Sequence, residues 1–133
     1  MRVRARPAER VRVPVKVEPF TRQRFISAGS EYDIHAIHAT EDGILFFQFV
    51  DDLGYPAWQP HLLFDVIDTS LPTDWHCNAF PENEVGTVVA IGPDFVVRNE
   101  TALADMIQLD ADQVDRFWKR LDALKATAGD RDG

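Results

Sequence analysis

The sequence has one cysteine, Cys77, among its 133 residues. A single thiol cannot form a disulfide within the chain, nor can it supply the paired sulfur ligands of a structural zinc site. A reduced domain of this size must therefore be held together by its apolar core alone. We interpret Cys77 itself as a small buried side chain rather than as a reactive thiol.

The sequence also lacks long apolar runs, because no stretch approaches the roughly 20 residues that cross a bilayer. Charged residues interrupt the N-terminal stretch throughout, unlike the apolar centre of a secretory signal. The seven glycines are scattered, so the phosphate-binding and dinucleotide-binding glycine patterns are missing, as is the nucleophile elbow of the hydrolases. These absences favour a cytoplasmic protein that is not an enzyme, has no cofactor and does not contact a membrane.

What the chain does have is an uneven charge. The formal net charge is −8, but residues 1–24 contain eight basic and two acidic residues, a net +6. The remaining residues contain six basic and twenty acidic residues, a net −14. Since an acidic body repels nucleic acid and attracts basic proteins, nucleic acid is a disfavoured partner. We expect the basic arm to dock on its own acidic body or on a second copy, which leaves a homodimer open.

Local patterns predict several short strands followed by helices. Residues 31–40 and 44–50 form the clearest hairpin, with Gly43 in the turn and the second strand apolar on both faces. Shorter strands are predicted at 55–58, where Pro56 and Pro60 favour a sheet edge, and at 62–67. A further hairpin joins 75–80 to 86–91. Asn99 is predicted to cap a short helix, and Asp110 begins a second one in a capping box with Gln113.

The final helix, residues 110–126, has an apolar stripe that should pack on the sheet. Its members are Val114, Phe117, Trp118, Leu121 and Leu124. The predicted fold class is α+β: a strongly bent antiparallel sheet or small SH3-like barrel of five to six strands, followed by two C-terminal helices. We expect residues 1–24 to be a basic arm, partly disordered or an edge strand because valines alternate from Val11 to Val17. Residues 25–126 would be one globular domain and 127–133 a disordered tail.

The residue types that perform catalysis or bind metal are present but poorly placed. On a strand, the spacing of His35 and His38 sends the two side chains to opposite faces. Metal binding would require convergence of His35, His38, His61 and Cys77, so we predict no metal site. The carboxylate pairs Asp51–Asp52 and Asp65–Asp68 lie at strand ends, where aspartate commonly accepts hydrogen bonds from a turn. A small hydrolase that uses these Asp and His residues is therefore only a second alternative.

A surface constellation is the better candidate for function. Asp51, Asp52, Tyr55 and Trp58 share one loop-and-edge segment that two prolines stiffen. Stiff aromatic side chains with acidic neighbours are typical of a binding hot spot for a basic protein. Glu82 and Glu84, in the predicted turn between residues 80 and 86, complete the candidate partner-binding set. The competing interpretation is that Tyr55 and Trp58 simply close the end of the barrel.

The stretch from Tyr32 to Trp75 also resembles a known kind of protein. The resemblance rests on Asp51-Asp52-Leu53-Gly54-Tyr55-Pro56-Ala57-Trp58, on Leu63-Phe64-Asp65-Val66-Ile67-Asp68, on Leu71-Pro72-Thr73-Asp74-Trp75, and on the later Gly92-Pro93. It is to small uncharacterised bacterial proteins, some of which look like immunity proteins for polymorphic or contact-delivered toxins. Such families diversify where they contact the toxin, so the resemblance implies a fold and a class of function but no contact residue.

The sequence therefore favours a non-enzymatic protein-binding domain, in particular an immunity-type inhibitor that neutralises a basic partner such as a toxin. The acidic body, the acidic-aromatic loop and the resemblance all point to this function. The alternative is a small barrel that associates with nucleic acid through the arginines and lysine of residues 2–24.

Overall fold

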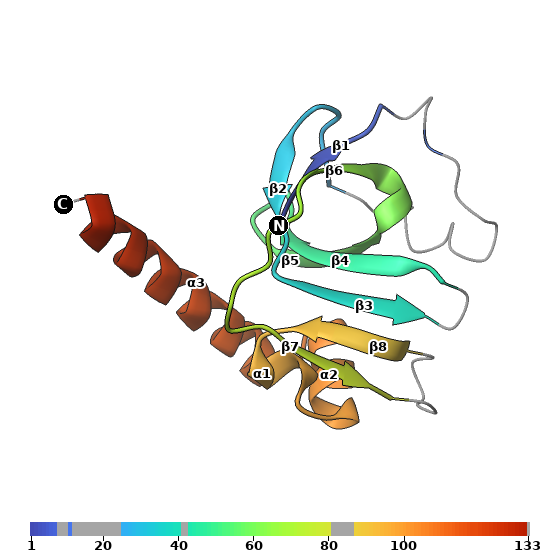
Figure 1. Ribbon diagram of the computed structural model, residues 1–133, viewed down its shortest axis with the longest axis vertical. Coiled ribbons are helices and arrows are strands. Elements are labelled where there is room, and N and C mark those ends of the chain that lie inside the picture. Colours follow the sequence, from blue (N-terminus) through green and yellow to red (C-terminus); the bar gives the residue numbers. More distant parts are fainter. Residues whose placement is uncertain (8–10, 12–24, 41–42, 81–86, 133) are drawn as a thin grey trace.

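The computed structural model describes residues 1–7, 11, 25–40, 43–80 and 87–132, and the chain is an α+β protein (Figure 1). The strands are β1 (Arg2–Ala5), β2 (Glu31–Asp33), β3 (Ala36–Thr40), β4 (Leu45–Val50), β5 (Pro56–Pro60), β6 (Phe64–Asp68), β7 (His76–Ala79) and β8 (Thr87–Gly92). A short 3-10 helix, η3 (His61–Leu63), joins β5 to β6. The helices α1 (Asp94–Val97), α2 (Glu100–Ile107) and α3 (Ala111–Asp132) follow the last strand.

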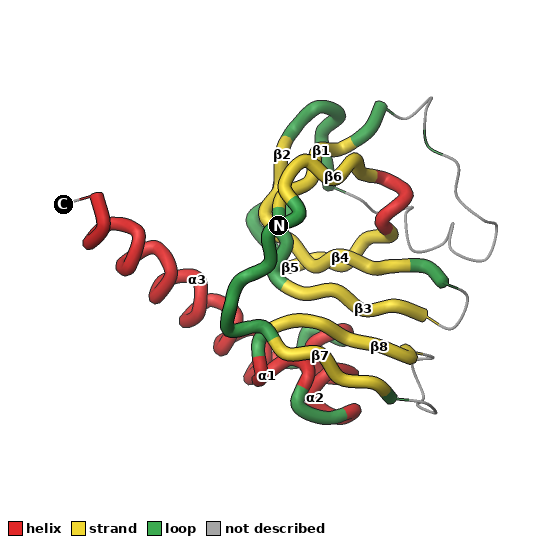
Figure 2. The backbone as a smooth tube through the Cα atoms, viewed as in Figure 1, coloured by secondary structure: helices red, strands yellow, loops and turns green. Residues whose placement is uncertain are grey.

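The strands form two antiparallel sheets and not a closed barrel (Figure 2). One sheet has the order β2-β1-β6 and the other has the order β5-β4-β3-β8-β7. The α+β class and the β7–β8 hairpin are confirmed, and β5 lies at an edge as its prolines predicted. The hairpin predicted for residues 31–40 and 44–50 is confirmed only from Ala36 onward, because residues 31–33 form β2 in the other sheet. The SH3-like barrel is not confirmed. The described residues form eight strands where five to six were expected, and α1 was not predicted.

The N-terminal strand is the main departure from the sequence prediction. β1 is the central strand of its sheet, with Val3 paired to Tyr32 on one side and to Val66 on the other. Val3 is 0% exposed and Ala5 is 2% exposed. Residues 2–5 of the predicted basic arm thus lie in the body of the fold, because their Arg-Val-Arg-Ala alternation sends small apolar side chains into the core. Of the strand predicted from Val11 to Val17, all but Val11 lies outside the described residues.

Two apolar clusters share the five-stranded sheet between them. The first lies between the two sheets and consists of Val3, Ala5, Tyr32, Ile34, Ile37, Phe47, Phe49, Leu63 and Phe64. The second lies between the five-stranded sheet and the helices and consists of Ala36, Phe80, Ala90, Val96, Val97, Leu103, Met106 and Phe117. Strand β4 is covered on both faces, as its continuous apolar sequence predicted.

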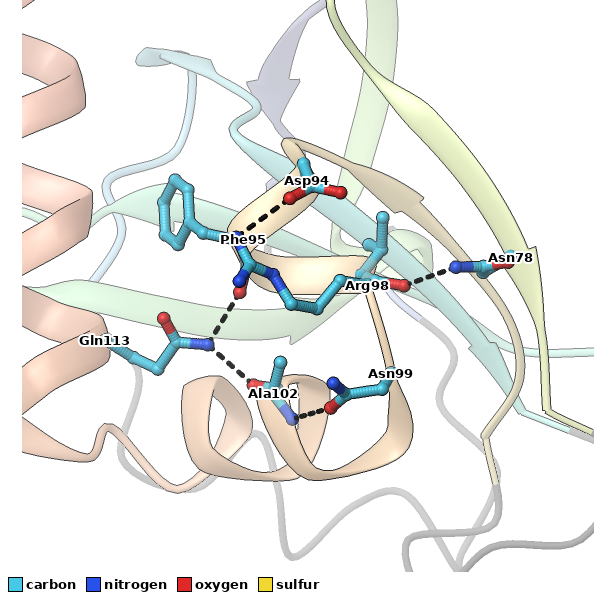
Figure 3. A network of polar contacts seen from close by, with 8 residues as sticks. Asn78, Asp94, Phe95, Arg98, Asn99, Ala102 and Gln113 are labelled. Atoms are coloured by element: carbon cyan, nitrogen blue, oxygen red, sulfur yellow. Dashed lines mark hydrogen bonds and ion pairs between the residues drawn. The ribbon is translucent and has the colours of Figure 1, made fainter.

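Side-chain amides connect the three helices to one another and to β7 (Figure 3). Asn99 accepts the Ala102 N–H at 2.8 Å, which confirms it as the cap of α2. The Gln113 amide donates to the carbonyl oxygens of Phe95 and Ala102, both at 2.8 Å, and thereby ties α3 to α1 and α2. The predicted capping box is wrong: the Asp110 N–H donates to the Asp105 carbonyl at 2.9 Å, so it does not need the Gln113 side chain.

Helix α3 packs on the body through its first turns only. Phe117 is 1% exposed and Trp118 and Leu121 are partly buried, whereas Leu124 is 47% exposed. Figure 1 shows the second half of α3 projecting away from the rest of the molecule. The prediction that the whole stripe packs on the sheet is therefore wrong beyond Leu121. The helix also continues to Asp132, through residues that the sequence predicted to be a disordered tail.

Candidate protein-binding site

The loop between β4 and β5 is shaped by hydrogen bonds to Asp51. One of its carboxylate oxygens accepts the backbone N–H groups of Leu53 and Tyr55, both at 3.0 Å. Gly54 has a φ of 82°, a value that glycine adopts without strain, and its N–H donates to the Asp51 carbonyl at 2.9 Å. Asp51 thus makes the turn hydrogen bonds that are typical of aspartate after a strand. Its main effect is to fix the conformation of the loop.

Asp52 joins this loop to the segment that precedes β2. Its carboxylate accepts hydrogen bonds from the Tyr32 and Ser27 hydroxyls, both at 2.6 Å. The Asp52 backbone N–H donates to the Phe25 carbonyl at 2.8 Å, and the Tyr32 hydroxyl accepts the Ser27 N–H at 2.9 Å. Burial, followed by the hydrogen bond to Asp52, raises the pKa of Tyr32, so its hydroxyl remains the donor to Asp52 near neutral pH. Residues 25–27 are therefore held against the loop.

This arrangement presents three large apolar side chains to solvent in one neighbourhood. Phe25 is 47% exposed, Leu53 is 56% exposed and Tyr55 is 64% exposed. We call Phe25, Asp51, Asp52, Leu53 and Tyr55 the β4–β5 surface. The sequence predicted Asp51, Asp52 and Tyr55 as part of such a surface. It missed Leu53, although a residue in a tight turn before glycine is commonly exposed, and it missed Phe25, for which no local signal exists.

The remaining predicted members lie elsewhere. Trp58 is only partly exposed, and its ring lies edge-on to His38 with the ring centroids 4.8 Å apart. Its indole N–H points to the Met106 carbonyl of α2 at 3.4 Å. Trp58 therefore packs between the sheet and the helices while Tyr55 is on the surface, so the two residues do not together close a barrel end as the competing interpretation held. Glu82 and Glu84 are outside the described residues.

The histidines and the cysteine do not come together. His38 is buried, stacked on Phe46, and His35 lies edge-on to Phe117 of α3 with the ring centroids 5.2 Å apart. Burial lowers the pKa of each imidazole to about 4. His61 contacts the backbone of Leu45. In the part of the chain that the structure describes, no three His, Cys, Asp or Glu side chains could hold a metal ion.

Cys77 corrects another prediction, because its side chain is exposed and not buried. It lies on the edge strand β7, where it pairs with Ile91 of β8 on one side only. Ile91, the residue opposite Cys77, packs against the first apolar cluster but is only partly buried, and Cys77 itself is not part of that cluster. The sequence could not show where this cluster ends on the sheet.

The basic residues of β1 and the adjacent Arg6 are paired with acids of the body. Arg2 contacts Asp33 at 3.0 Å, Arg4 contacts Glu31 at 3.6 Å, and the Arg6 side chain lies 3.6 Å from Asp65. This confirms, for residues 2–6, that the basic segment docks on its own acidic body. Exposed ion pairs add little to stability, so the main effect of these contacts is on charge and register. The other basic residues of the segment, from Arg10 to Arg24, lie outside the described residues.

Comparisons with protein-family models, with curated proteins and with solved structures found no match to this chain. The candidate site is therefore defined by its own geometry. Among the helices in the described part of the chain, none is long and apolar enough to cross a membrane. The exposed side chains and the charges around them indicate which class of protein this site fits.

Proposed function

We propose that the protein is a non-enzymatic binding protein, an immunity-type inhibitor that neutralises a basic partner such as a bacterial toxin. The observation that carries this proposal is the β4–β5 surface. Its apolar side chains are exposed on a loop that Asp51 and Asp52 hold in one conformation. A preorganised loop loses little conformational freedom on binding, which is a property of efficient interfaces.

The roles of the residues in this surface differ from those that the sequence alone suggested. Leu53, Tyr55 and Phe25 would enter the interface, because large exposed apolar and aromatic side chains dominate binding energies. Asp51 and Asp52 already accept hydrogen bonds within the protein. Their contribution would be to shape the loop and to add negative charge beside it. Arg24, which precedes Phe25 in the sequence, is outside the described residues.

The overall charge supports a basic partner. The chain carries a net charge of −8, and three of the arginines in its basic segment are already paired with carboxylates. Electrostatic attraction of this kind accelerates association and weakens as salt is added. An inhibitor of a nuclease-type toxin, whose active site binds phosphate and is therefore basic, fits this pattern. We propose that it acts in the cytoplasm, where a lone cysteine remains reduced.

The two alternatives receive less support. A nucleic-acid-binding barrel would need unpaired cations, and the three arginines of the basic segment that the structure describes, Arg2, Arg4 and Arg6, each contact an acid. A hydrolase would need converging Asp and His side chains, yet Asp51 and Asp52 structure the β4–β5 loop while His38 of β3 is buried against Phe46 and Trp58. We therefore retain the binding protein as the proposed function.

The test is a comparison of matched surface variants in the native host. Wild-type protein, Leu53→Ser, Tyr55→Ser and the control Leu124→Ser are expressed with a C-terminal affinity tag, and bound proteins are identified by mass spectrometry. Leu124 is as exposed as Phe25 but lies on the projecting part of α3. We expect one basic protein to be recovered with the wild type and the control but not with the loop variants.

The recovered protein is then purified and titrated by calorimetry at low and high salt. Truncation of a hot-spot side chain lowers affinity by about 2 kcal/mol or more, which is roughly thirtyfold. The proposal fails if no basic protein is recovered, if the loop variants bind as well as Leu124→Ser does, or if the affinity does not depend on salt.

A further inference from the structure

The outer face of the three-stranded sheet carries a regular alternation of charge. Paired residues on neighbouring antiparallel strands lie on the same face, with their side chains side by side. Two rows cross β2, β1 and β6 in the order acid, arginine, acid: Asp33–Arg2–Asp68 and Glu31–Arg4–Asp65. The register of β6 shifts by one residue between these rows, so Asp65 and Asp68 can share a face although they are three residues apart. Each arginine therefore has a carboxylate on both sides. Each row ends in an acid at both edges of the sheet, so a further strand would meet negative charge first.

Strand β6 is an edge strand whose outer side is open. Among the residues that the structure describes, none pairs with that side. The Arg6 N–H donates to the Leu63 carbonyl at 2.8 Å, so the peptide groups of Leu63 face β1. Successive residues of an antiparallel strand direct their peptide groups to alternate sides. Those of Asp65 therefore also face β1, and those of Val66 face the open edge. Val66 is 43% exposed and Ile67 is 39% exposed.

The sequence of this edge discriminates between occupants. Because the peptide groups of Val66 face the open edge, an antiparallel pair of two β6 strands would set Val66 opposite Val66 and Asp65 against the register shift at Ile67–Asp68 of the other copy. This pair would bring aspartates of the two copies together, and like charges across a strand pair are destabilising, so the edge disfavours a second copy of the chain. In an added strand of alternating sequence, one cation opposite Asp65 and a second opposite the shift at Ile67–Asp68 would instead continue both rows. An apolar residue opposite Val66 would extend the first apolar cluster, since Val66 pairs with the buried Val3.

We propose that the β6 edge binds an extended segment of a partner protein in which basic and apolar residues alternate, as an added strand of the three-stranded sheet. The backbone groups of Val66 would supply main-chain hydrogen bonds, and the two aspartates would select for lysine or arginine. This site is separate from the β4–β5 surface. It does not depend on the proposed inhibitor function, and the two can fail independently because they involve different residues.

The experiment uses the full chain labelled with ¹⁵N and a synthetic peptide, acetyl-Thr-Arg-Val-Lys-Val-Arg-Thr-amide. A control peptide replaces each arginine and lysine with glutamate. We expect the basic peptide to shift the amide resonances of β6 and to slow hydrogen exchange of the Val66 amide. The control peptide should do neither. Binding should weaken with added salt, because the selecting charges are exposed to solvent.

Two variants locate the effect. The double variant Asp65→Lys/Asp68→Lys should bind the basic peptide at least about tenfold more weakly and should accept the glutamate peptide. Val66→Pro removes an N–H that faces the open edge without removing a bond to β1. It should retain the wild-type spectrum outside β6 and lose affinity for the peptide. If the double variant does not fold, Val66→Pro still tests the site.

Three outcomes would overturn the proposal. The basic peptide could shift resonances spread over the acidic surface and not those of β6, which would indicate attraction by net charge alone. The two peptides could bind equally, which would exclude selection by the aspartates. The Val66 amide could already be protected in the protein without peptide, which would show that a segment such as 12–24 of the chain itself, or a second copy, occupies the edge. Sedimentation separates these last two occupants.

Discussion

Acidification should destabilise the protein well before its carboxylates titrate, because His38 is buried in its neutral form. His38 is 6% exposed, and burial lowers the pKa of its imidazole from 6.5 to about 4. The unfolded chain therefore binds a proton between these two pH values while the folded chain does not. By linkage, stability is complete above about pH 7 and is lost as the pH falls from 6.5 toward 4.

The magnitude follows from the two pKa values. Between pH 7 and pH 5, a histidine with these values in the unfolded and folded states lowers the free energy of unfolding by about 2 kcal/mol. His35 should act in the same direction, since burial also lowers its pKa to about 4, with a small opposing effect from Asp33. His35 retains some solvent exposure, so we expect a smaller contribution from it. A total of about 3 kcal/mol is a large fraction of the 5–15 kcal/mol that is typical of a domain.

The measurement is urea unfolding followed by tryptophan fluorescence at pH 7, 6 and 5, for the wild type and for His38→Phe, His35→Phe and His76→Gln. In each phenylalanine variant, the free energy of unfolding should depend less on pH, by the contribution of the histidine that was replaced. His76→Gln is the matched control, because it replaces a histidine whose side chain is exposed. The reasoning is refuted if the wild type loses less than about 0.5 kcal/mol between pH 7 and pH 5, or if His38→Phe keeps the wild-type slope.

Three further predictions concern single features of the fold. The side-chain nitrogen and oxygen of Gln48 are buried without a hydrogen-bond partner, so Gln48→Met should raise the free energy of unfolding by about 1–3 kcal/mol. If urea titration shows a loss of stability instead, the amide is hydrogen-bonded in solution. Leu109, which follows α2, has a φ of 58°, a left-handed conformation that favours glycine. In the same assay Leu109→Gly should therefore be about 1 kcal/mol more stable than Leu109→Ala, and equal stabilities would exclude backbone strain at this residue. Arg120 of α3 donates two hydrogen bonds to Asp74, at 2.6 and 3.1 Å. A double-mutant cycle with alanine at both positions should therefore give a coupling free energy of about 1 kcal/mol. A coupling near zero would show that this pair does not hold α3 to the segment that contains Asp74.

Local patterns predicted the elements that depend on local sequence. The alternation and turn glycine around residues 31–50 predicted the β3–β4 hairpin, and Asn99 capped α2 as expected. The separation into two sheets was not predictable, because β1 pairs with residues about 30 and about 60 positions away. The apolar–polar alternation of a four-residue strand does not indicate which other strands it pairs with. The capping of Asp110 was missed for a different reason, because its N–H is satisfied locally by the Asp105 carbonyl, while the Gln113 amide donates to Phe95 and Ala102.

The candidate site was predicted in part for similar reasons. Asp51, Asp52 and Tyr55 lie in one loop, so sequence proximity was enough to group them. Trp58 was grouped with them by the same criterion, but its place on β5 directs its side chain toward α2. Phe25 is brought to the loop by hydrogen bonds between segments far apart in the sequence. Sequence proximity can therefore nominate a binding loop, but long-range contacts determine which side chains complete it.

The central position of β1 also has a consequence for the order in which the protein folds. β1 can pair only after the chain has closed loops of about 30 residues to β2 and about 60 residues to β6. The β3–β4 hairpin closes over a few residues and should form much earlier. Refolding should thus have a fast phase in the five-stranded sheet and a slower one in which β1 enters between its two neighbours. The arginines of β1 would reach their carboxylates only in that slower step.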